Sequence, residues 1–311
     1  MPKANPFGAQ STADQVIAGI DLTGKHIVVT GCNSGIGFAT MSALAANGAH
    51  VIGLARSIDL ARAACARAAP SSTAVACDLA DFRSIGAAVG KIRELGVPLD
   101  AIVANAGIAH FPGLETRYGV EMHFLTNYLG HFVLVNALVD SVRNGVGRIV
   151  IVGADVRKQR EPEAGIMFDN LDGGKFYRPA AFYRQSKFAN ALYAKHLSQR
   201  LSGRSICVNS LHPGTTRGTR LHRHASLPAR IVLSAAQVLQ RNVEHGAATQ
   251  TLLAASPRVA GISGQHWMNC AIAKGHPMYQ DAELARRLWT VSVDVVARHC
   301  TPVLNQLQQA A

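Results

Sequence analysis

Short apolar runs alternate with longer amphipathic stretches along most of this chain. The apolar runs that predict strands lie at 26–30, 51–55, 75–77, 101–104, 148–152, 206–211 and 264–268. Helical patterns fill the intervals, notably at 38–47 and 182–201, and a short helix is expected at 13–20. Strands that alternate with helices over this length predict an α/β fold with a doubly wound parallel sheet.

The same pattern predicts one domain. No internal repeat or low-complexity linker divides the chain, so we expect a single folded unit at 25–300, with a polar leader at 1–24 and a tail at 301–311. Hydrophobic residues make up 48% of the 311 positions, enough for a sizeable core. No apolar run approaches the roughly 20 residues of a membrane span, and residues 1–10 lack the order of a secretory signal, so we expect a cytoplasmic protein.

The chain is basic, with a formal net charge of +12. Its basic residues are scattered, without zinc-finger or basic coiled-coil spacing, which argues against a nucleic-acid partner. Two loose clusters stand out, Arg157, Lys158 and Arg160, then Arg217, Arg220, Arg223 and Arg230. They are either a solvated surface or a means of attracting an anionic cofactor or substrate. The six cysteines show neither a CxxC pair nor a metal-ligand spacing, so we expect reduced thiols and no metal site.

A glycine loop joins the first predicted strand to a helix. It reads Thr30-Gly31-Cys32-Asn33-Ser34-Gly35-Ile36-Gly37. Such a loop brings backbone N–H groups, and the positive end of the helix dipole, close to a pyrophosphate. Glycines also mark ordinary tight turns, but the strand before and the helix after favour a dinucleotide site in a Rossmann-type sheet.

Three further strand ends carry candidate cofactor contacts. Arg56 follows the second strand, where a guanidinium accommodates a ribose 2′-phosphate and favours NADP(H) over NAD(H), although it could instead be a surface charge. Asp78, followed by Leu79, comes after the third strand and could bond the adenine amino group or cap a helix. Asn105-Ala106-Gly107 supplies small residues beside the ribose.

Tyr183 and Lys187 are candidate reacting groups. Their i, i+4 spacing places them on one face of a helix. A tyrosine with an ordinary pKa near 10 is a poor acid–base group at neutral pH. The Lys187 ammonium and an oxidised nicotinamide would each lower that pKa, so that Tyr183 could exchange a proton with an alkoxide or alcohol.

Together these motifs resemble the short-chain dehydrogenase/reductase family, within it the retinol-dehydrogenase and WW-domain-oxidoreductase type, over Asp21 to about Val296. The matching segments are TGxxxGIG at 30–37, NAG at 105–107, YxxSK at 183–187, HPG at 212–214, and the stretches 19–25, 127–132 and 284–289. The resemblance implies NAD(P)-dependent hydride transfer. It also implies a catalytic Asn127, whose kinked helix holds a water linking Lys187 to solvent, and nicotinamide contacts at Pro213, Gly214 and Thr216.

The serine that the resemblance implies after the fifth strand is missing. Aligned on the family's pattern, Ala154 takes its place, and losing one such donor typically costs about 2.7–4 kcal/mol of transition-state stabilisation. Asp155 could turn inward instead, either protonated as a donor or ionised as a stabiliser of positive charge, or it could be a cap or loop residue outside the site. The substrate could be an imine or enone, or turnover could be lost.

The segment 215–256 takes the place of the family's mobile substrate flap. It holds an apolar stretch, Leu227 to Leu239, beside the second arginine cluster. We therefore expect an NADPH-dependent reductase of a carbonyl-like group on a lipophilic, possibly anionic small molecule. An imine or enone reductase and a non-catalytic NADP(H)-binding scaffold or sensor are the alternatives. The resemblance also implies a homodimer or homotetramer.

Overall fold

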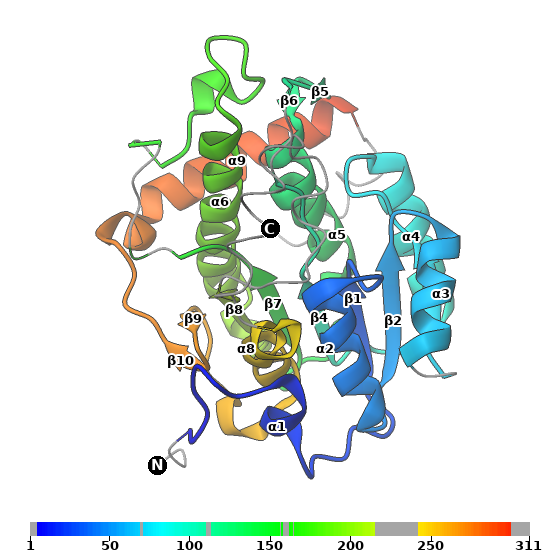
Figure 1. The fold of residues 1–311 in the computed structure, drawn as a ribbon. Coiled ribbons are helices and arrows are strands. Elements are labelled where there is room, and N and C mark those ends of the chain that lie inside the picture. The colour runs from blue at the N-terminus through cyan, green and yellow to red at the C-terminus, as the bar shows by residue number, and fades with distance from the viewer. Residues whose placement is uncertain are drawn as a thin grey trace.

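The predicted strands lie in one sheet in the computed structural model, which describes residues 5–68, 71–109, 113–155, 157, 162–163, 165–214 and 242–299. Their bounds are His26–Thr30 (β1), His50–Ala55 (β2), Thr73–Ala76 (β3), Ala101–Ala104 (β4), Arg148–Val152 (β7), Cys207–His212 (β8) and His266–Met268 (β9), and the sheet gains a strand that was not predicted, Ala271–Ile272 (β10). Within the described residues the order is β10-β9-β8-β7-β4-β1-β2-β3, parallel except for the antiparallel pair β9–β10 (Figure 1). The predicted doubly wound parallel sheet is confirmed.

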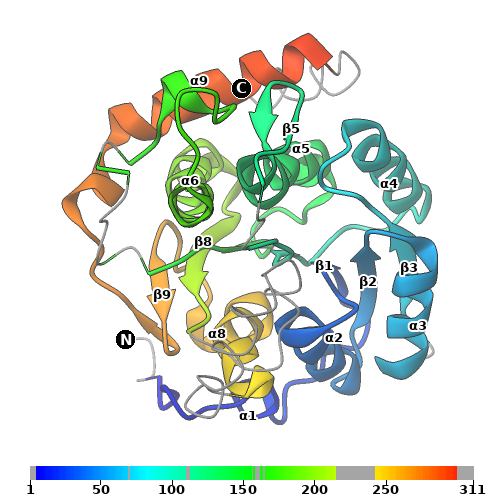
Figure 2. The same cartoon turned by 45° about the horizontal axis from the view of Figure 1, so that its top comes forward.

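Helices cover both faces of this sheet (Figures 1 and 2). One apolar layer contains residues of Phe82–Glu94 (α4), Gly130–Leu138 (α5), Pro179–Arg200 (α6) and Ala282–His299 (α9). The other contains residues of Ala13–Ile17 (α1), Gly35–Ala46 (α2), Ile58–Ala68 (α3) and Val243–Ala255 (α8). Successive strand residues point to opposite faces, so Val28 packs in the first layer and its neighbours Ile27 and Val29 in the second.

Several boundaries differ from the prediction by one to three residues, and local geometry explains one of the three-residue differences. The first helix ends at Ile17 rather than at residue 20, because Gly19 has a φ of +73°. The third strand covers Thr73–Ala76 and so begins two residues before the predicted run. A β-hairpin of Thr116–Arg117 (β5) and Val120–Glu121 (β6) was not predicted. No helix in the described part of the chain is long and apolar enough to span a membrane.

The sheet order places the site. From β1 the chain adds β2 and β3 on one side and then returns to add β4 on the other, so the order reverses between β1 and β4. In open α/β sheets, ligands bind beyond the carboxyl ends of the strands at such a reversal. The loop at 31–34 and the segment 105–107 both follow strands that end there.

Candidate active site

The glycine loop is shaped by contacts within the protein. Gly31 and Gly35 have φ values of +69° and +55°, which favour glycine. A Cβ on Gly37 would lie 2.3 Å from the Gly31 carbonyl oxygen, so helix α2 starts against the loop backbone. Ser34 stands at the N-cap, yet its side chain makes no capping hydrogen bond. That leaves the N–H groups of the first turn for an anion, and the loop therefore fits a dinucleotide pyrophosphate. Asn33 and Ile36 lie in the same turn.

Thr30 fastens this loop to the segment after β4. Its hydroxyl accepts hydrogen bonds from the backbone N–H groups of Asn105 (2.9 Å) and Ala106 (3.0 Å), and its carbonyl accepts one from the Asn105 side chain (2.9 Å). A Cβ on Gly107 would lie 3.0 Å from Asn127 Oδ1 and 3.1 Å from Lys187 Nζ. The predicted cofactor segment 105–107 therefore lies between the glycine loop and the predicted reacting groups.

The adenosine end of the predicted site is more open. Arg56 is exposed directly after β2 and pairs with no carboxylate among the described residues. Asp78 is half-buried, and its Oδ1 accepts a hydrogen bond from Ala80 N (3.0 Å). The cap of helix α4 is Asp81, so the cap alternative for Asp78 is wrong. Leu79 is buried, and its carbonyl packs against Gly130.

Tyr183 and Lys187 lie on α6, one turn apart. Lys187 is 4% exposed, and its Nζ donates to the Val152 carbonyl at 3.2 Å. Burial lowers the pKa of Lys187 to about 8 and raises the pKa of Tyr183 to about 12. The second shift is opposite to the expected direction, because burial disfavours the charged phenolate. At neutral pH, Tyr183 therefore holds its proton.

Asn127 joins α6 to the segment after β4. Its Nδ2 donates to Ser186 Oγ and to the Ile108 carbonyl, both at 3.0 Å, and its Oδ1 accepts from Ile108 N at 2.7 Å. The implied kink is present as a π-helical turn, Phe124–Leu129. This turn frees the Asn127 carbonyl, but Asn190 Nδ2 (3.0 Å) and His131 Nδ1 (2.9 Å) already bond it. Because a carbonyl oxygen has two lone pairs, these two donors satisfy it.

His131 is a connecting residue that the sequence reasoning missed. Its Nδ1 bonds the Asn127 carbonyl, and its Nε2 lies 2.9 Å from the Thr30 hydroxyl. Burial lowers its pKa to about 4, so the ring is neutral at pH 7 and takes one tautomer. Nδ1 then donates to the carbonyl and Nε2 accepts from the hydroxyl. The motif 127–132 contained the signal, since Asn127 and His131 are i and i+4 on a helix.

Asp155 does not hold a proton at neutral pH. Arg157 donates to it from Nε (2.8 Å) and Nη2 (2.7 Å) as well as from its backbone N–H (3.0 Å). The Arg157 side-chain bonds, followed by its other interactions and the charge of His212, lower the pKa of Asp155 to about 2. The protonated-donor hypothesis is therefore wrong, and Asp155 is an ionised, half-exposed partner of Arg157. Ala154 precedes it after β7, where the family serine was expected.

The remaining predicted contacts follow β8. Pro213 and Gly214 are half-buried there, and Gly214 has a φ of +81°. Thr216, the arginine cluster at 217–230 and the apolar stretch 227–239 lie outside the described residues, as do Lys158 and Arg160. The last part of the predicted flap is helix α8, whose Gln250 donates to Thr40 Oγ1 (2.5 Å) and Asn105 Oδ1 (3.3 Å).

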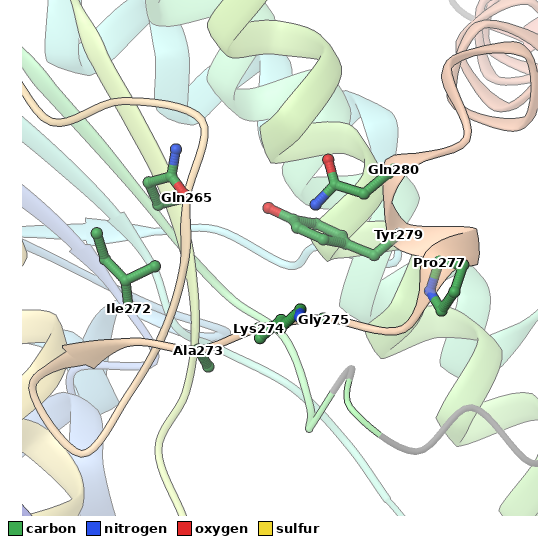
Figure 3. A pocket seen from close by; sticks show the side chains of 8 residues that line it. All are labelled: Gln265, Ile272, Ala273, Lys274, Gly275, Pro277, Tyr279 and Gln280. Carbon is green, nitrogen blue, oxygen red and sulfur yellow. The ribbon is translucent and has the colours of Figure 1, made fainter.

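A cavity of about 470 Å³ lies beside β9 and β10 (Figure 3). Its lining mixes apolar Ile272, Pro277 and Tyr279 with Gln265, Lys274 and Gln280. The Tyr279 ring stands edge-on to His266, with centroids 5.9 Å apart. His266 of β9 is in turn bonded by Ser210 of β8 at 2.8 Å. The cavity therefore adjoins β9 and β10, at the far end of the strand order from the reversal between β1 and β4.

Comparison with known proteins agrees with this geometry. Residues 25–166 match the family model described as short chain dehydrogenase. Retinol dehydrogenase 14 of Mus musculus is 35% identical over 86% of this chain and 85% of its own length. The chain belongs to the short-chain dehydrogenase/reductase family. The WW domain-containing oxidoreductase of Pongo abelii is 33% identical over 92% of this chain and 71% of its own length.

A solved structure extends the likeness to the fold. A crystal structure from Mycobacterium Paratuberculosis, described as a putative uncharacterized protein, superposes with a TM-score of 0.69 at 27% identity. The match covers 89% of this chain and 95% of that one. As a member of this family, the chain is an NAD(P)-dependent oxidoreductase of a small-molecule substrate, similar to the retinol-dehydrogenase type.

Proposed function

We propose that this chain is an NADPH-dependent reductase of a carbonyl-like group on a lipophilic small molecule, with Tyr183 as the proton donor. The observation that carries the proposal is the position of Tyr183. It lies one turn from Lys187 on α6, and that helix is bonded through Ser186 and Asn127 to the segment containing Gly107. A protonated phenol therefore stands beside the predicted nicotinamide end of the cofactor site.

The preference for NADP(H) rests on Arg56. This exposed guanidinium directly follows β2, where the family's acidic residue for a ribose 2′-hydroxyl would stand. The first turn of α2 would hold the pyrophosphate, and Asp78 would face the adenine. When bound, the cofactor supplies the hydride.

Tyr183, Lys187 and Asn127 have different parts in the proposed reaction. Because burial raises the pKa of Tyr183 to about 12, its phenol carries the proton that the developing alkoxide oxygen would need in a reduction. Lys187, whose Nζ donates to the Val152 carbonyl, would bind the nicotinamide ribose. Asn127 holds α6 and the segment at 108 in register through Ser186 and Ile108.

A second candidate reaction is the reduction of an imine or enone. Ala154 offers no donor to a ketone oxygen, whereas the ionised Asp155 carries a negative charge one residue away. An anion near a cationic transition state stabilises it, as an iminium substrate requires. We further propose that the chain forms a homodimer or homotetramer. We also propose a reducing compartment such as the cytoplasm, which the five free cysteines among the described residues support.

The test is NADPH consumption, compared with NADH, by the parent chain, Ala154→Ser and Tyr183→Phe across ketones, cyclic imines and enones. A ketone reductase should gain about 10²–10³ in ketone turnover from the restored serine. An imine or enone reductase should gain nothing from it. In both cases Tyr183→Phe should lose nearly all turnover while still binding NADPH, and equal behaviour of Tyr183→Phe and parent would mean a scaffold without catalysis.

A further inference from the structure

A buried acid–base pair lies next to Tyr183. Glu121, at the end of β6, and His123 have side chains that are both 0% exposed, and His123 Nδ1 lies 2.6 Å from Glu121 Oε1. Burying two ionisable groups is costly unless each is well bonded. The pair therefore needs an explanation beyond general packing.

Helix capping explains one oxygen of Glu121 but not the pair. Oε2 accepts hydrogen bonds from the backbone N–H groups of His123 (2.8 Å) and Phe124 (3.1 Å), at the start of the π-helical turn. Oε1 instead faces the imidazole, and the Tyr177 hydroxyl donates to it at 3.4 Å. Burial, followed by the charge of Glu121, raises the pKa of Tyr177, so this hydroxyl remains a donor. Glu121 thus accepts in all of these hydrogen bonds, and its Oε1 orients the His123 ring.

The oriented ring packs against Tyr183. The two ring centroids are 6.2 Å apart and the planes are inclined by 77°, an edge-on contact. One turn further along the chain, Asn127 bonds Ser186 at 3.0 Å. The segment from 121 to 127 therefore holds α6 at two successive levels, once at the tyrosine and once next to the lysine.

We propose that His123 is a positioning residue for Tyr183, oriented by Glu121 and supported by Tyr177. The proposal rests on the proposed function, because it is the proton transfer from Tyr183 that the contact would serve. A fixed ring keeps the phenol at one distance from the substrate oxygen, and misplacement of a reacting group by about 1 Å can cost 10²-fold in rate.

Two substitutions at one position separate positioning from stability. His123→Asn keeps a donor near the Nδ1 position for Glu121 and removes the ring edge. His123→Phe keeps a ring against Tyr183 and removes the imidazole partner of Glu121 Oε1. We expect His123→Asn to lower kcat by about 10–100-fold with an unchanged dissociation constant for NADPH. We expect His123→Phe to lose more stability and less kcat than His123→Asn. His50→Asn, at the opposite end of the sheet, is the matched control.

A second readout does not depend on turnover. Protein that carries 3-fluorotyrosine at its six tyrosines gives a ¹⁹F signal for position 183, which Tyr183→Phe identifies by its loss. We expect His123→Asn to shift that signal and His50→Asn to leave it in place.

The proposal is overturned if kcat and the ¹⁹F signal are both unchanged in His123→Asn. It is equally overturned if stability, NADPH binding and kcat all fall together and most strongly in His123→Phe, as a purely structural role of the Glu121–His123 bond would give. Should the parent chain turn over no substrate, the proposed function has failed, and the ¹⁹F signal alone still decides whether His123 positions Tyr183.

Discussion

The Lys187 ammonium is almost fully buried, and its pKa falls from 10.5 to about 8 for that reason. The unfolded chain keeps this proton up to about pH 10.5, whereas the folded chain releases it at about pH 8. Unfolding therefore takes up a proton between these values, and the free energy of unfolding rises with pH across the window. Below about pH 8 both states are charged, and the folded state carries the full cost of the buried ammonium.

We predict that Lys187→Met removes this pH dependence. The free energy of unfolding of this variant at pH 7 should exceed that of the parent by up to about 3 kcal/mol, and the difference should shrink toward pH 10. Reductase activity should be lost because the ammonium beside Tyr183 is gone. Urea unfolding at pH 7, 9 and 10 measures the stability difference and its pH dependence, with the exposed Lys91→Met as control. A parent whose stability does not rise between pH 8 and 10 would contradict the burial argument.

At the scale of elements, the π-helical turn connects the two halves of the site. It presents the Asn127 carbonyl to His131, whose other nitrogen accepts from Thr30. Thr30 in turn holds the backbone of Asn105 and Ala106. One buried, neutral ring therefore links Thr30, at the end of β1, to the π-helical turn, and Asn190 of α6 bonds the same Asn127 carbonyl.

We predict that His131→Leu weakens both stability and cofactor binding. It leaves the Thr30 hydroxyl with only the Val103 carbonyl, at 3.5 Å, as an acceptor and the Asn127 carbonyl with one donor fewer, so we expect a loss of about 1–3 kcal/mol in the free energy of unfolding. The dissociation constant for NADPH should rise. A cycle with Thr30→Val and the double variant tests the link, since coupled residues give non-additive losses. Additive losses would show that His131 and Thr30 act independently.

The elements themselves were largely predictable, whereas the connections between them were not. Local patterns determine strands such as β4 and β7, whose predicted bounds match the structure, and the i, i+4 spacing placed Tyr183 and Lys187 on one helix face. The bond between Thr30 and His131 joins residues 101 positions apart, which no local pattern indicates. The direction of the Tyr183 pKa shift likewise depends on burial by distant elements.

At the scale of the whole molecule, the predicted leader is part of the core. Helix α1 packs against α8, and its Val16 and Ile17 are buried in the layer that also contains Leu252. Arg258, just beyond α8, lies over the Phe7 ring at 5.9 Å. The beginning of the described chain thus closes over a helix that follows it by more than two hundred residues.

We predict that Ile17→Ala lowers the free energy of unfolding by about 2–5 kcal/mol, because the side chain is 0% exposed and leaves a cavity. NADPH binding at 25 °C should be unchanged, since α1 lies away from the strand ends that form the cradle. Urea unfolding and an NADPH titration measure the two quantities, and Asp14→Ala on the exposed face of α1 is the control. A loss below about 1 kcal/mol would mean that α1 is only loosely attached.

The contact between α1 and α8 also sets an order of events during synthesis. Ile17 leaves the ribosome 226 residues before Val243, the first residue of its partner helix. At about 5–20 residues per second, the apolar face of α1 waits roughly 11–45 s for that partner. The sheet centre formed by β1, β2 and β4 can assemble during this interval, but the contact between α1 and α8 cannot form until Val243–Ala255 has been synthesised. Val16 and Ile17 therefore lack this partner throughout that interval.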